Sequence, residues 1–209
     1  MSKSVNLLML VLLMLSIAGC NQNQSITIGN QVWSTKNLDV PTFRNGDPIP
    51  EVKSAEEWSK AGYTGQAAWC YYENDPANGE KYGKMYNWYA VKDPRGLCPT
   101  GWHVPSDAEW TVLTDYLGGE DAAGGKMKST SGWDNDGNGN NSSGFAGLPG
   151  GYRGDSGAFY SVGKFGSWWS STEGSTNYAW SRYLPNASDR VTGGNNHKSN
   201  GLSIRCLRD

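Results

Sequence analysis

Histidine is scarce in this sequence, and the motifs of common catalytic sites are missing from it. The chain has two histidines, His103 and His197, which lie far apart in the sequence. No Gly-x-Ser-x-Gly, His-Glu-x-x-His or phosphate-binding loop occurs. His103 lies between Trp102 and Val104, a setting more typical of a structural histidine than of a general base. These absences favour a protein that is not an enzyme.

Charged residues are also few. Asp, Glu, Lys and Arg make up 18% of the chain, and the net charge is −2 at neutral pH. A domain that binds nucleic acid usually carries a clear excess of positive charge, so we do not expect nucleic acid as a partner. The ten tryptophans and eleven tyrosines supply the core in place of aliphatic residues. Low charge and abundant Gly, Ser and Asn are typical of an extracellular, loop-rich protein.

The sequence has one long apolar run, which lies at its N-terminus. Lys3 precedes an apolar segment over residues 7–17, which is short for a membrane span. Small residues directly before Cys20 form a lipobox, the processing signal of bacterial lipoproteins. We therefore predict a lipoprotein signal peptide over residues 1–19 and lipidation of Cys20. An ordinary signal peptide followed by a chance cysteine is the alternative.

Residues 20–25 are then the lipidated cysteine and a short polar tether. Acyl chains on Cys20 would anchor the protein to the membrane without a spanning helix. We expect the domain in the cell envelope, outside the cytoplasm, where disulfide bonds persist. Asn21 gives no clear signal for retention in the inner membrane, which favours the outer membrane.

Residues 26–209 are enough for one domain with its own core. This segment has three cysteines, Cys70, Cys98 and Cys206, so three single pairings are possible. We favour Cys98–Cys206, because a bond that closes a loop of about 100 residues contributes about 4–5 kcal/mol in the chain-entropy model. Cys70 is then expected to be a small buried side chain among aromatic neighbours.

The clearest helix start lies at Ser106. Ser106 and Glu109 have the spacing of a capping box, and Trp110 begins an apolar stripe on one face. Gly118 and the glycine after it are expected to end this helix. A second, shorter helix is predicted by the same capping pattern from Ser54.

The remaining elements are predicted as short strands between loops. Residues 26–33 predict a hairpin with a Gly-Asn turn, and residues 74–82 a polar loop. Residues 85–91 are compatible with either strand or helix. From residue 124 onward the chain is rich in Gly, Ser and Asn. The strands predicted there are residues 126–128, 144–148, 159–161, 168–171, 179–184 and 202–207.

Six motifs follow one another along the chain. They are Ile28-Gly-Asn-Gln-Val-Trp33, Tyr82-Gly-Lys-Met-Tyr-Asn-Trp-Tyr-Ala90, Cys98-Pro-Thr-Gly-Trp-His-Val-Pro-Ser-Asp-Ala-Glu-Trp110, Gly147-Leu-Pro-Gly-Gly-Tyr-Arg153, Trp168-Trp-Ser-Ser171 and Gly201-Leu-Ser-Ile-Arg-Cys206. Together they resemble the Fibrobacter succinogenes major paralogous domain. The resemblance covers nearly the whole chain after the tether.

The resemblance implies a C-type-lectin-like α+β fold, which also includes the formylglycine-generating enzymes. Such a fold has short helices, small twisted antiparallel sheets and, here, long ordered loops rich in Gly, Asn and Ser. In it a disulfide bonds a helix near the middle to the last strand, which agrees with the Cys98–Cys206 pairing. The family is found in lipoproteins and secreted proteins of Bacteroidetes-type bacteria. It supplies no catalytic residues, and the chain lacks the redox-active thiol pair of formylglycine-generating enzymes.

One loop resembles part of a calcium site. The run Asp-Asn-Asp-Gly-Asn-Gly that starts at residue 134 matches the first half of an EF-hand loop. The candidate metal ligands are Asp134, Asp136, Asn138 and Asn140. The twelfth position holds Phe145 in place of the bidentate glutamate, so a true EF-hand is not expected. A looser calcium site and a solvated Asx/Gly turn remain as alternatives, and calcium is the one cofactor considered.

The C-terminal loops form a second candidate surface. Its residues are Tyr178, Trp180, Arg182, Tyr183, Asn195, Asn196 and His197. Aromatic faces stack on sugars or on protein side chains, and Asn adapts its hydrogen bonds, which is why these residue types dominate other binding loops. Packing in the core is the alternative for the aromatic members.

These observations predict a lipid-anchored extracytoplasmic domain that recognises a ligand through its C-terminal loops. Polysaccharide is the first ligand class and a surface protein is the second. A structural or adhesive component of the envelope without a small ligand is the alternative function. An enzyme of the formylglycine-generating type is the third.

Overall fold

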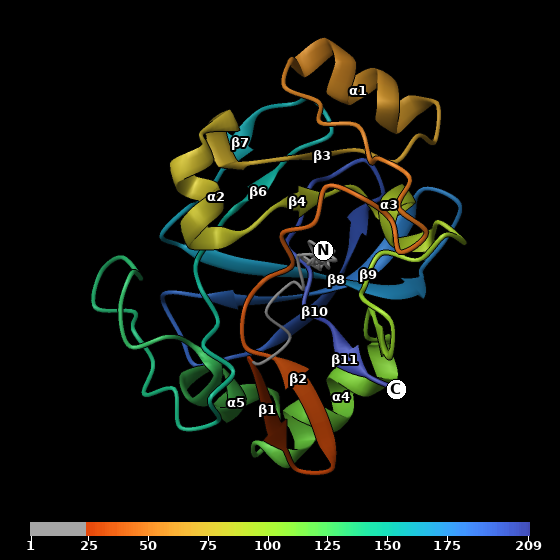
Figure 1. The fold of residues 1–209 in the computed structure, drawn as a ribbon. Helices are drawn as coiled ribbons and strands as arrows, with labels where there is room; N and C mark the ends of the chain where they lie inside the picture. The colour runs from red at the N-terminus through yellow and green to blue at the C-terminus, as the bar shows by residue number, and fades with distance from the viewer. Residues whose placement is uncertain (1–23) are drawn as a thin grey trace, which may run out of the picture.

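The computed structural model describes residues 24–209, which combine short helices with small antiparallel sheets (Figure 1). The helices are α1 (Ala55–Tyr63), the 3-10 helix η1 (Tyr72–Asn74), α2 (Pro76–Tyr82), α3 (Trp88–Lys92), α4 (Asp107–Tyr116) and α5 (Glu120–Met127). The strands are β1 (Ser25–Ile28), β2 (Gln31–Ser34), β3 (Trp69–Cys70), β4 (Met85–Tyr86), β5 (Trp102–His103), β6 (Tyr152–Arg153), β7 (Phe159–Tyr160), β8 (Phe165–Glu173), β9 (Tyr178–Pro185), β10 (Thr192–His197) and β11 (Leu207–Arg208). The predicted signal peptide, the lipidation site Cys20 and the first part of the tether lie outside the described residues.

Two sheets form the framework. Four strands pair in the order β1-β2-β11-β5, and three longer strands pair in the order β10-β9-β8. All pairings between these strands are antiparallel. In Figure 1 the strands β8 and β9 cross the middle of the molecule, with α1 at one end and the β1–β2 hairpin with α4 at the other. The predicted combination of α-helices with small antiparallel sheets is therefore confirmed.

The helix start predicted at Ser106 is confirmed. The Ser106 hydroxyl accepts from the Glu109 amide, and the Glu109 carboxylate accepts from the Ser106 amide at 2.8 Å, which completes the capping box. Trp110 and Leu113 are buried. Trp110 packs on Trp33 of β2 with the ring centroids 4.7 Å apart. This aromatic contact holds α4 against the four-stranded sheet.

The disulfide predicted between Cys98 and Cys206 is present, with the two Cα atoms 6.1 Å apart. It joins the segment before β5 and α4 to the start of β11, so it fastens the last strand to the middle of the chain. Cys70 is free and buried in a cluster that includes Trp58. Burial raises the pKa of the Cys70 thiol to about 11, which keeps it protonated and unreactive at neutral pH.

Two segments differ from the sequence prediction. Residues 74–82, predicted as a loop, contain α2, because Asp75 caps the helix and a proline follows it at the first helical position. Residues 126–128, predicted as a strand, contain the end of α5. A Cβ added at Gly124 would lie 2.5 Å from the carbonyl oxygen of Asp189. This close approach requires glycine, a weak helix former, inside the helix.

Other local differences have similar causes. Residues 85–91 contain both alternatives, β4 followed by α3, because Asn87 accepts from the Ala90 amide and caps the helix. Residues 144–148 hold a single bridge and no strand. Strand β10 was not predicted, because its sequence Thr-Gly-Gly-Asn-Asn-His has little β propensity. Its pairing with β9 produces the strand.

Two buried arginines hold the long loops. The partners of the Arg205 guanidinium are the side chain of Asn37 and the carbonyls of Ser34, Phe145 and Ala146. The partners of the Arg153 guanidinium are the carbonyls of Gly157, Val52, Lys53 and Ser54. Burial lowers the pKa of Arg205 to about 9, so the group still carries its charge at neutral pH. Each guanidinium thus satisfies several backbone carbonyls, most of them in loops.

Candidate functional site

A polar and aromatic cleft of about 610 Å³ lies between α1 and the C-terminal loops. Its lining residues are Ser59, Gly62, Tyr63, Tyr89, Asp155, Ser156, Asn177, His197 and Ser199. They come from α1, α3, the β6–β7 turn, the β8–β9 turn and the end of β10 with the residues after it. The volume lies within the range of about 300–1,000 Å³ that is usual for small-ligand sites.

Helix α1 forms one wall of the cleft and is held tightly in place. Ser54 begins the helix by accepting from the Glu57 amide. On the inner face, the indole nitrogen of Trp58 donates to the carbonyl of Ser199 at 2.9 Å. A Cβ added at Gly62 would lie 2.3 Å from the Ser199 hydroxyl oxygen. The helix therefore contacts the C-terminal loop directly, and the wall is fixed.

Aromatic rings are exposed around this opening. Tyr63 at the end of α1 is 93% exposed, and Tyr89 of α3 is half-buried. Tyr178, the residue after the lining residue Asn177, is 46% exposed. Single exposed apolar side chains are ordinary on a protein surface, but here several occur at one cleft. Their faces are open to a ligand.

Polar groups without internal partners lie beside these rings. The Ser59 hydroxyl donates to the backbone carbonyl of Asp155 at 2.7 Å, which holds the β6–β7 turn on α1. One carboxylate oxygen of Asp155 accepts from the Ser156 amide at 2.8 Å. Within residues 24–209, the other carboxylate oxygen of Asp155 and the side-chain amide of Asn177 form no hydrogen bond. These groups are free to bond a ligand.

Five of the seven residues predicted for ligand binding lie on one face of the β9–β10 pair; of these Arg182 is buried, and the other four form two pairs of opposite residues. Tyr178 pairs with His197, and Trp180 pairs with Asn195. Residues opposite each other in an antiparallel pair share a face of the sheet. Tyr178 and Asn195 are exposed, and the other two are half-buried. His197 lines the cleft, so this face adjoins the cleft at that residue.

Arg182, also predicted for ligand binding, has a different role in the structure. It is buried, and its guanidinium pairs with the carboxylate of Asp107 at the start of α4. A second guanidinium nitrogen donates to the Thr111 hydroxyl at 3.1 Å. Arg182 therefore ties β9 to α4, and its charge is not exposed to a ligand.

The last two predicted residues also make internal contacts. The Asn196 amide nitrogen donates to the Ser181 hydroxyl at 2.7 Å. Tyr183 packs edge-on against Phe165 with the ring centroids 6.0 Å apart. Tyr183 and Asn196 lie on the other face of the β9–β10 pair, away from Tyr178. They support the sheet and do not extend the cleft.

The sequence matches the model of the Fibrobacter succinogenes major domain over residues 26–208. The chain belongs to this family. The resemblance of the six motifs is thereby confirmed, and the match covers the domain predicted from residue 26 onward. No curated protein and no solved structure matches the chain significantly. Within residues 24–209, no helix combines the length and the apolar character needed to cross a membrane.

The six motifs of this Fibrobacter succinogenes major domain build the scaffold more than the cleft. Arg153 is the last residue of one motif and Arg205 the second-last of another, and both are buried loop anchors. Tyr63 and Asp155 lie outside every motif, whereas Tyr89 lies within one. The chemistry of the cleft is therefore set mainly by residues that lie outside the six motifs.

The candidate calcium loop of this domain is organised by its own side chains. The Asn138 side-chain oxygen accepts from the Trp133 amide at 3.1 Å, and that of Asn140 accepts from the Ser142 amide at 2.9 Å. The second bond is typical of an Asx turn, and the first closes the loop back onto the residue before it. The described part of the chain has no group of three or more His, Cys, Asp or Glu positioned to hold a metal. Calcium binding by this loop stays a prediction.

His103 lies away from the cleft, between two carboxylates. Its Nδ1 is 2.6 Å from an Asp209 oxygen, and its Nε2 is 3.0 Å from a Glu109 oxygen. Carboxylate oxygens accept hydrogen bonds, and both ring nitrogens can donate to them at once only in the imidazolium form, so this setting favours the charged ring. Burial opposes this charge, but the bonds to Asp209 and Glu109 outweigh burial and raise the pKa of His103. The histidine bridges β5, α4 and the residue after β11.

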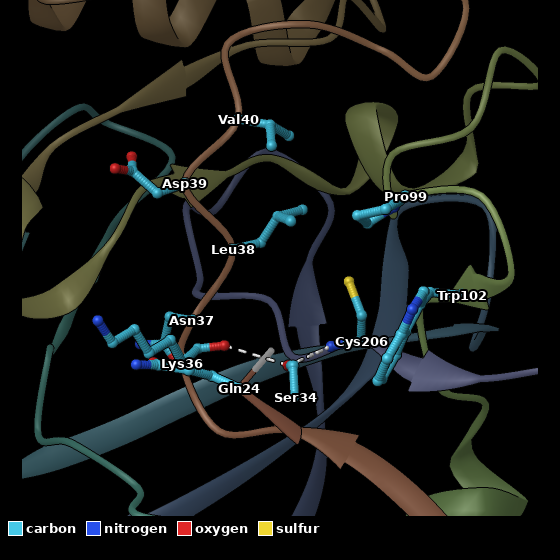
Figure 2. A pocket seen from close by; sticks show the side chains of 10 residues that line it. All are labelled: Gln24, Ser34, Lys36, Asn37, Leu38, Asp39, Val40, Pro99, Trp102 and Cys206. Carbon is cyan, nitrogen blue, oxygen red and sulfur yellow. Dashed lines mark hydrogen bonds between the residues drawn. The ribbon is translucent and has the colours of Figure 1, made fainter. Parts of the chain in front are cut away.

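Figure 2 shows a second hollow, of about 340 Å³, beside the disulfide. Its lining residues are Gln24, Ser34, Lys36, Asn37, Leu38, Asp39, Val40, Pro99, Trp102 and Cys206. Its walls are mainly apolar, and the Trp102 ring lies beside Cys206. The polar side chains of Ser34, Asn37 and Asp39 bond to other parts of the fold.

The sequence analysis did not find Tyr63, Tyr89 or Asp155. One signal for Tyr63 was present, because it follows Trp58 by five residues. At 100° per residue, that spacing places Tyr63 on the face of the helix away from the buried tryptophan. A large aromatic residue on an outer face is a usable sign of a binding surface. The approach of Asp155 to α1 depends on a tertiary contact and has no local signal.

Proposed function

We propose that this chain is a lipid-anchored extracytoplasmic recognition domain that binds polysaccharide in the cleft between α1 and the C-terminal loops. The observation that carries the proposal is that the rings of Tyr63 and Tyr89 line the cleft together with free polar groups of Asp155 and Asn177. Tyr178 packs on the lining residue His197. These side chains come from distant parts of the sequence, and the fold brings them to one opening.

The chemistry of a sugar ring fits this arrangement. A pyranose has an apolar face of C–H bonds and a rim of hydroxyl groups, each of which donates and accepts hydrogen bonds. Tyrosine rings offer flat apolar surfaces that stack on the C–H face. Carboxylate and amide groups offer acceptors and donors for the hydroxyl groups. The Tyr178–His197 pair of β9 and β10 adjoins the cleft and offers a further ring beside it, which suits a chain of sugars better than a single one.

The proposed location rests on two observations. The lipobox before Cys20 supports a lipid anchor in the cell envelope, for which we favour the outer membrane. The Cys98–Cys206 disulfide is in keeping with an oxidising compartment outside the cytoplasm. The small antiparallel sheets and the bond from the middle of the chain to the last strand also support the C-type-lectin-like fold that the family resemblance implies.

Binding in the cleft does not require calcium. The calcium loop over residues 134–140 is not among the segments that line the cleft, and two of its amide oxygens already bond backbone amides. Sugar binding should therefore survive removal of calcium. Binding that depends on calcium would instead place the sugar at Asp134 and Asp136.

The test is a glycan array probed with the purified full-length protein, once with calcium and once with a chelator. The proposal predicts capture of a polysaccharide in both conditions. Capture should be about tenfold weaker in Tyr63→Ala and unchanged in Tyr116→Ala, a matched control. Tyr116 is also an exposed tyrosine, 65% accessible, but it lies beside the β1–β2 turn at the other end of the molecule (Figure 1). A blank array with folded protein would contradict the polysaccharide proposal and favour a protein partner.

A further inference from the structure

The charges around the cleft have one sign. Asp155 is the acidic residue among the described lining residues, and none of those residues is lysine or arginine. Lys198 lies between two lining residues in the chain, but it is buried. Its ammonium group bonds the Glu173 carboxylate and the Thr176 carbonyl, so its charge is already compensated. Lys60 of α1 lines a different hollow.

Asp155 is also held in a fixed position at the cleft. Its backbone carbonyl accepts from Ser59, which fixes the β6–β7 turn to α1. Its side chain is oriented by the bond from the Ser156 amide. Of its two carboxylate oxygens, the second has no partner among the described residues. A ligand in the cleft would therefore meet a carboxylate with an unused acceptor.

We infer that Asp155 determines the class of polysaccharide, selecting neutral chains over chains that carry uronic acid or sulfate groups. This inference rests on the proposed function of the cleft. The free carboxylate oxygen accepts a hydrogen bond from a sugar hydroxyl. It repels a carboxylate or sulfate on the ligand, because no lining cation offsets the two like charges. The specificity then comes from electrostatic repulsion between the Asp155 carboxylate and an anionic ligand.

The decisive variant is Asp155→Asn. Asparagine has the same shape, and its amide oxygen can still accept from Ser156, while the backbone bond from Ser59 is unaffected. The fold should therefore be unchanged, which the melting temperature checks. Glu80→Gln is the matched control, because it removes one negative charge from an exposed residue on α2, away from the lining residues.

The experiment measures the affinity of the full-length protein for neutral hexose oligosaccharides and for uronic-acid oligosaccharides of equal length. We expect the wild type to favour the neutral chain about tenfold, which corresponds to about 1.4 kcal/mol. Asp155→Asn should reduce this ratio to about twofold or less, mainly by strengthening uronate binding, and Glu80→Gln should not. The preference of the wild type should also fall as salt is raised from about 0.05 to about 1 M, since screening weakens the repulsion.

The outcomes separate the two claims. Binding of both chains with equal affinity, or a ratio that Asp155→Asn leaves unchanged, would overturn the role of Asp155 and leave the cleft as a sugar site. Failure of the wild type to bind either chain, or any other glycan, would overturn the proposed function and this inference together.

Discussion

The phenol ring of Tyr178 meets the imidazole ring of His197 edge-on, with the centroids 5.5 Å apart and the planes at 82°. The two residues are direct partners in the register of β9 and β10. His197 lines the cleft, whereas Tyr178 belongs to the exposed face of the strand pair. The contact therefore connects Tyr178, a residue of the binding surface predicted from the sequence, to the cleft. The opposite wall of that cleft is α1, which lies far away in the sequence.

Two residues of β9 are expected to separate binding from stability. Tyr178→Ala should abolish glycan capture and change the free energy of unfolding by no more than about 0.5 kcal/mol, because the side chain is 46% exposed. Arg182→Ala should cost about 2–4 kcal/mol, because it leaves the Asp107 carboxylate without its buried partner. Urea unfolding and the glycan array measure the two effects. A large loss of stability in Tyr178→Ala would assign that residue to the core.

The sequence predicted the parts of the fold whose signals are local. The capping box at Ser106 and the Gly-Asn turn of the first hairpin depend on neighbouring residues, and both are present. The β10 strand and the α5 helix were missed, because Gly-rich segments take their structure from tertiary partners, as Gly124 does from Asp189. The α1 wall of the cleft was also missed. The sequence predicted the helix itself, but its position beside the C-terminal loops depends on a tertiary contact, the Trp58–Ser199 bond.

Arg205 should be one of the most sensitive residues of the scaffold. Arg205→Leu leaves buried carbonyls without donors, and each unsatisfied group costs about 1–3 kcal/mol. We expect a loss of about 3–5 kcal/mol in urea unfolding, since such costs do not add fully. Arg205→Lys should recover part of it by bonding one or two of these carbonyls. A loss below about 1 kcal/mol would show that the loops do not depend on this guanidinium.

The bridge at His103 predicts a pH dependence of stability. The raised pKa of His103 means that its stabilisation is fully present below its ordinary value of 6.5 and is lost as the pH rises through the raised value. Burial opposes ionisation of Glu109, but the bonds from Ser106 and His103 prevail and lower its pKa from 4.5. The stabilisation from Glu109 is therefore present above pH 4.5 and is lost as the pH falls through the lowered value.

The bridge should thus be strongest between about pH 4.5 and 6.5, and the melting temperature should fall as the pH rises further. The contribution should not exceed about 1 kcal/mol, because the groups are partly exposed. His103→Gln is expected to flatten the slope of melting temperature against pH between about 6 and 8. An identical slope in wild type and variant would contradict this account.

The cysteines should differ sharply in reactivity. Under native conditions an alkylating reagent should leave Cys70 unmodified, because the thiol is buried and its raised pKa of about 11 keeps it protonated. In denaturant without reductant, mass spectrometry should find Cys70 alkylated and Cys98 still linked to Cys206. The Cys98→Ala variant should lose about 2–5 kcal/mol of stability. Rapid native labelling of Cys70 would contradict its burial.

The most direct measurement is the affinity of the captured polysaccharide for the wild type and for the variants Tyr63→Ala, Tyr89→Ala and Tyr116→Ala. The account predicts that loss of either cleft ring, Tyr63 or Tyr89, weakens binding about tenfold. The control Tyr116→Ala should bind as the wild type does, because that ring lies beside the β1–β2 turn. Unchanged affinity in both cleft variants, with the fold intact, would contradict the claim that this cleft binds the sugar.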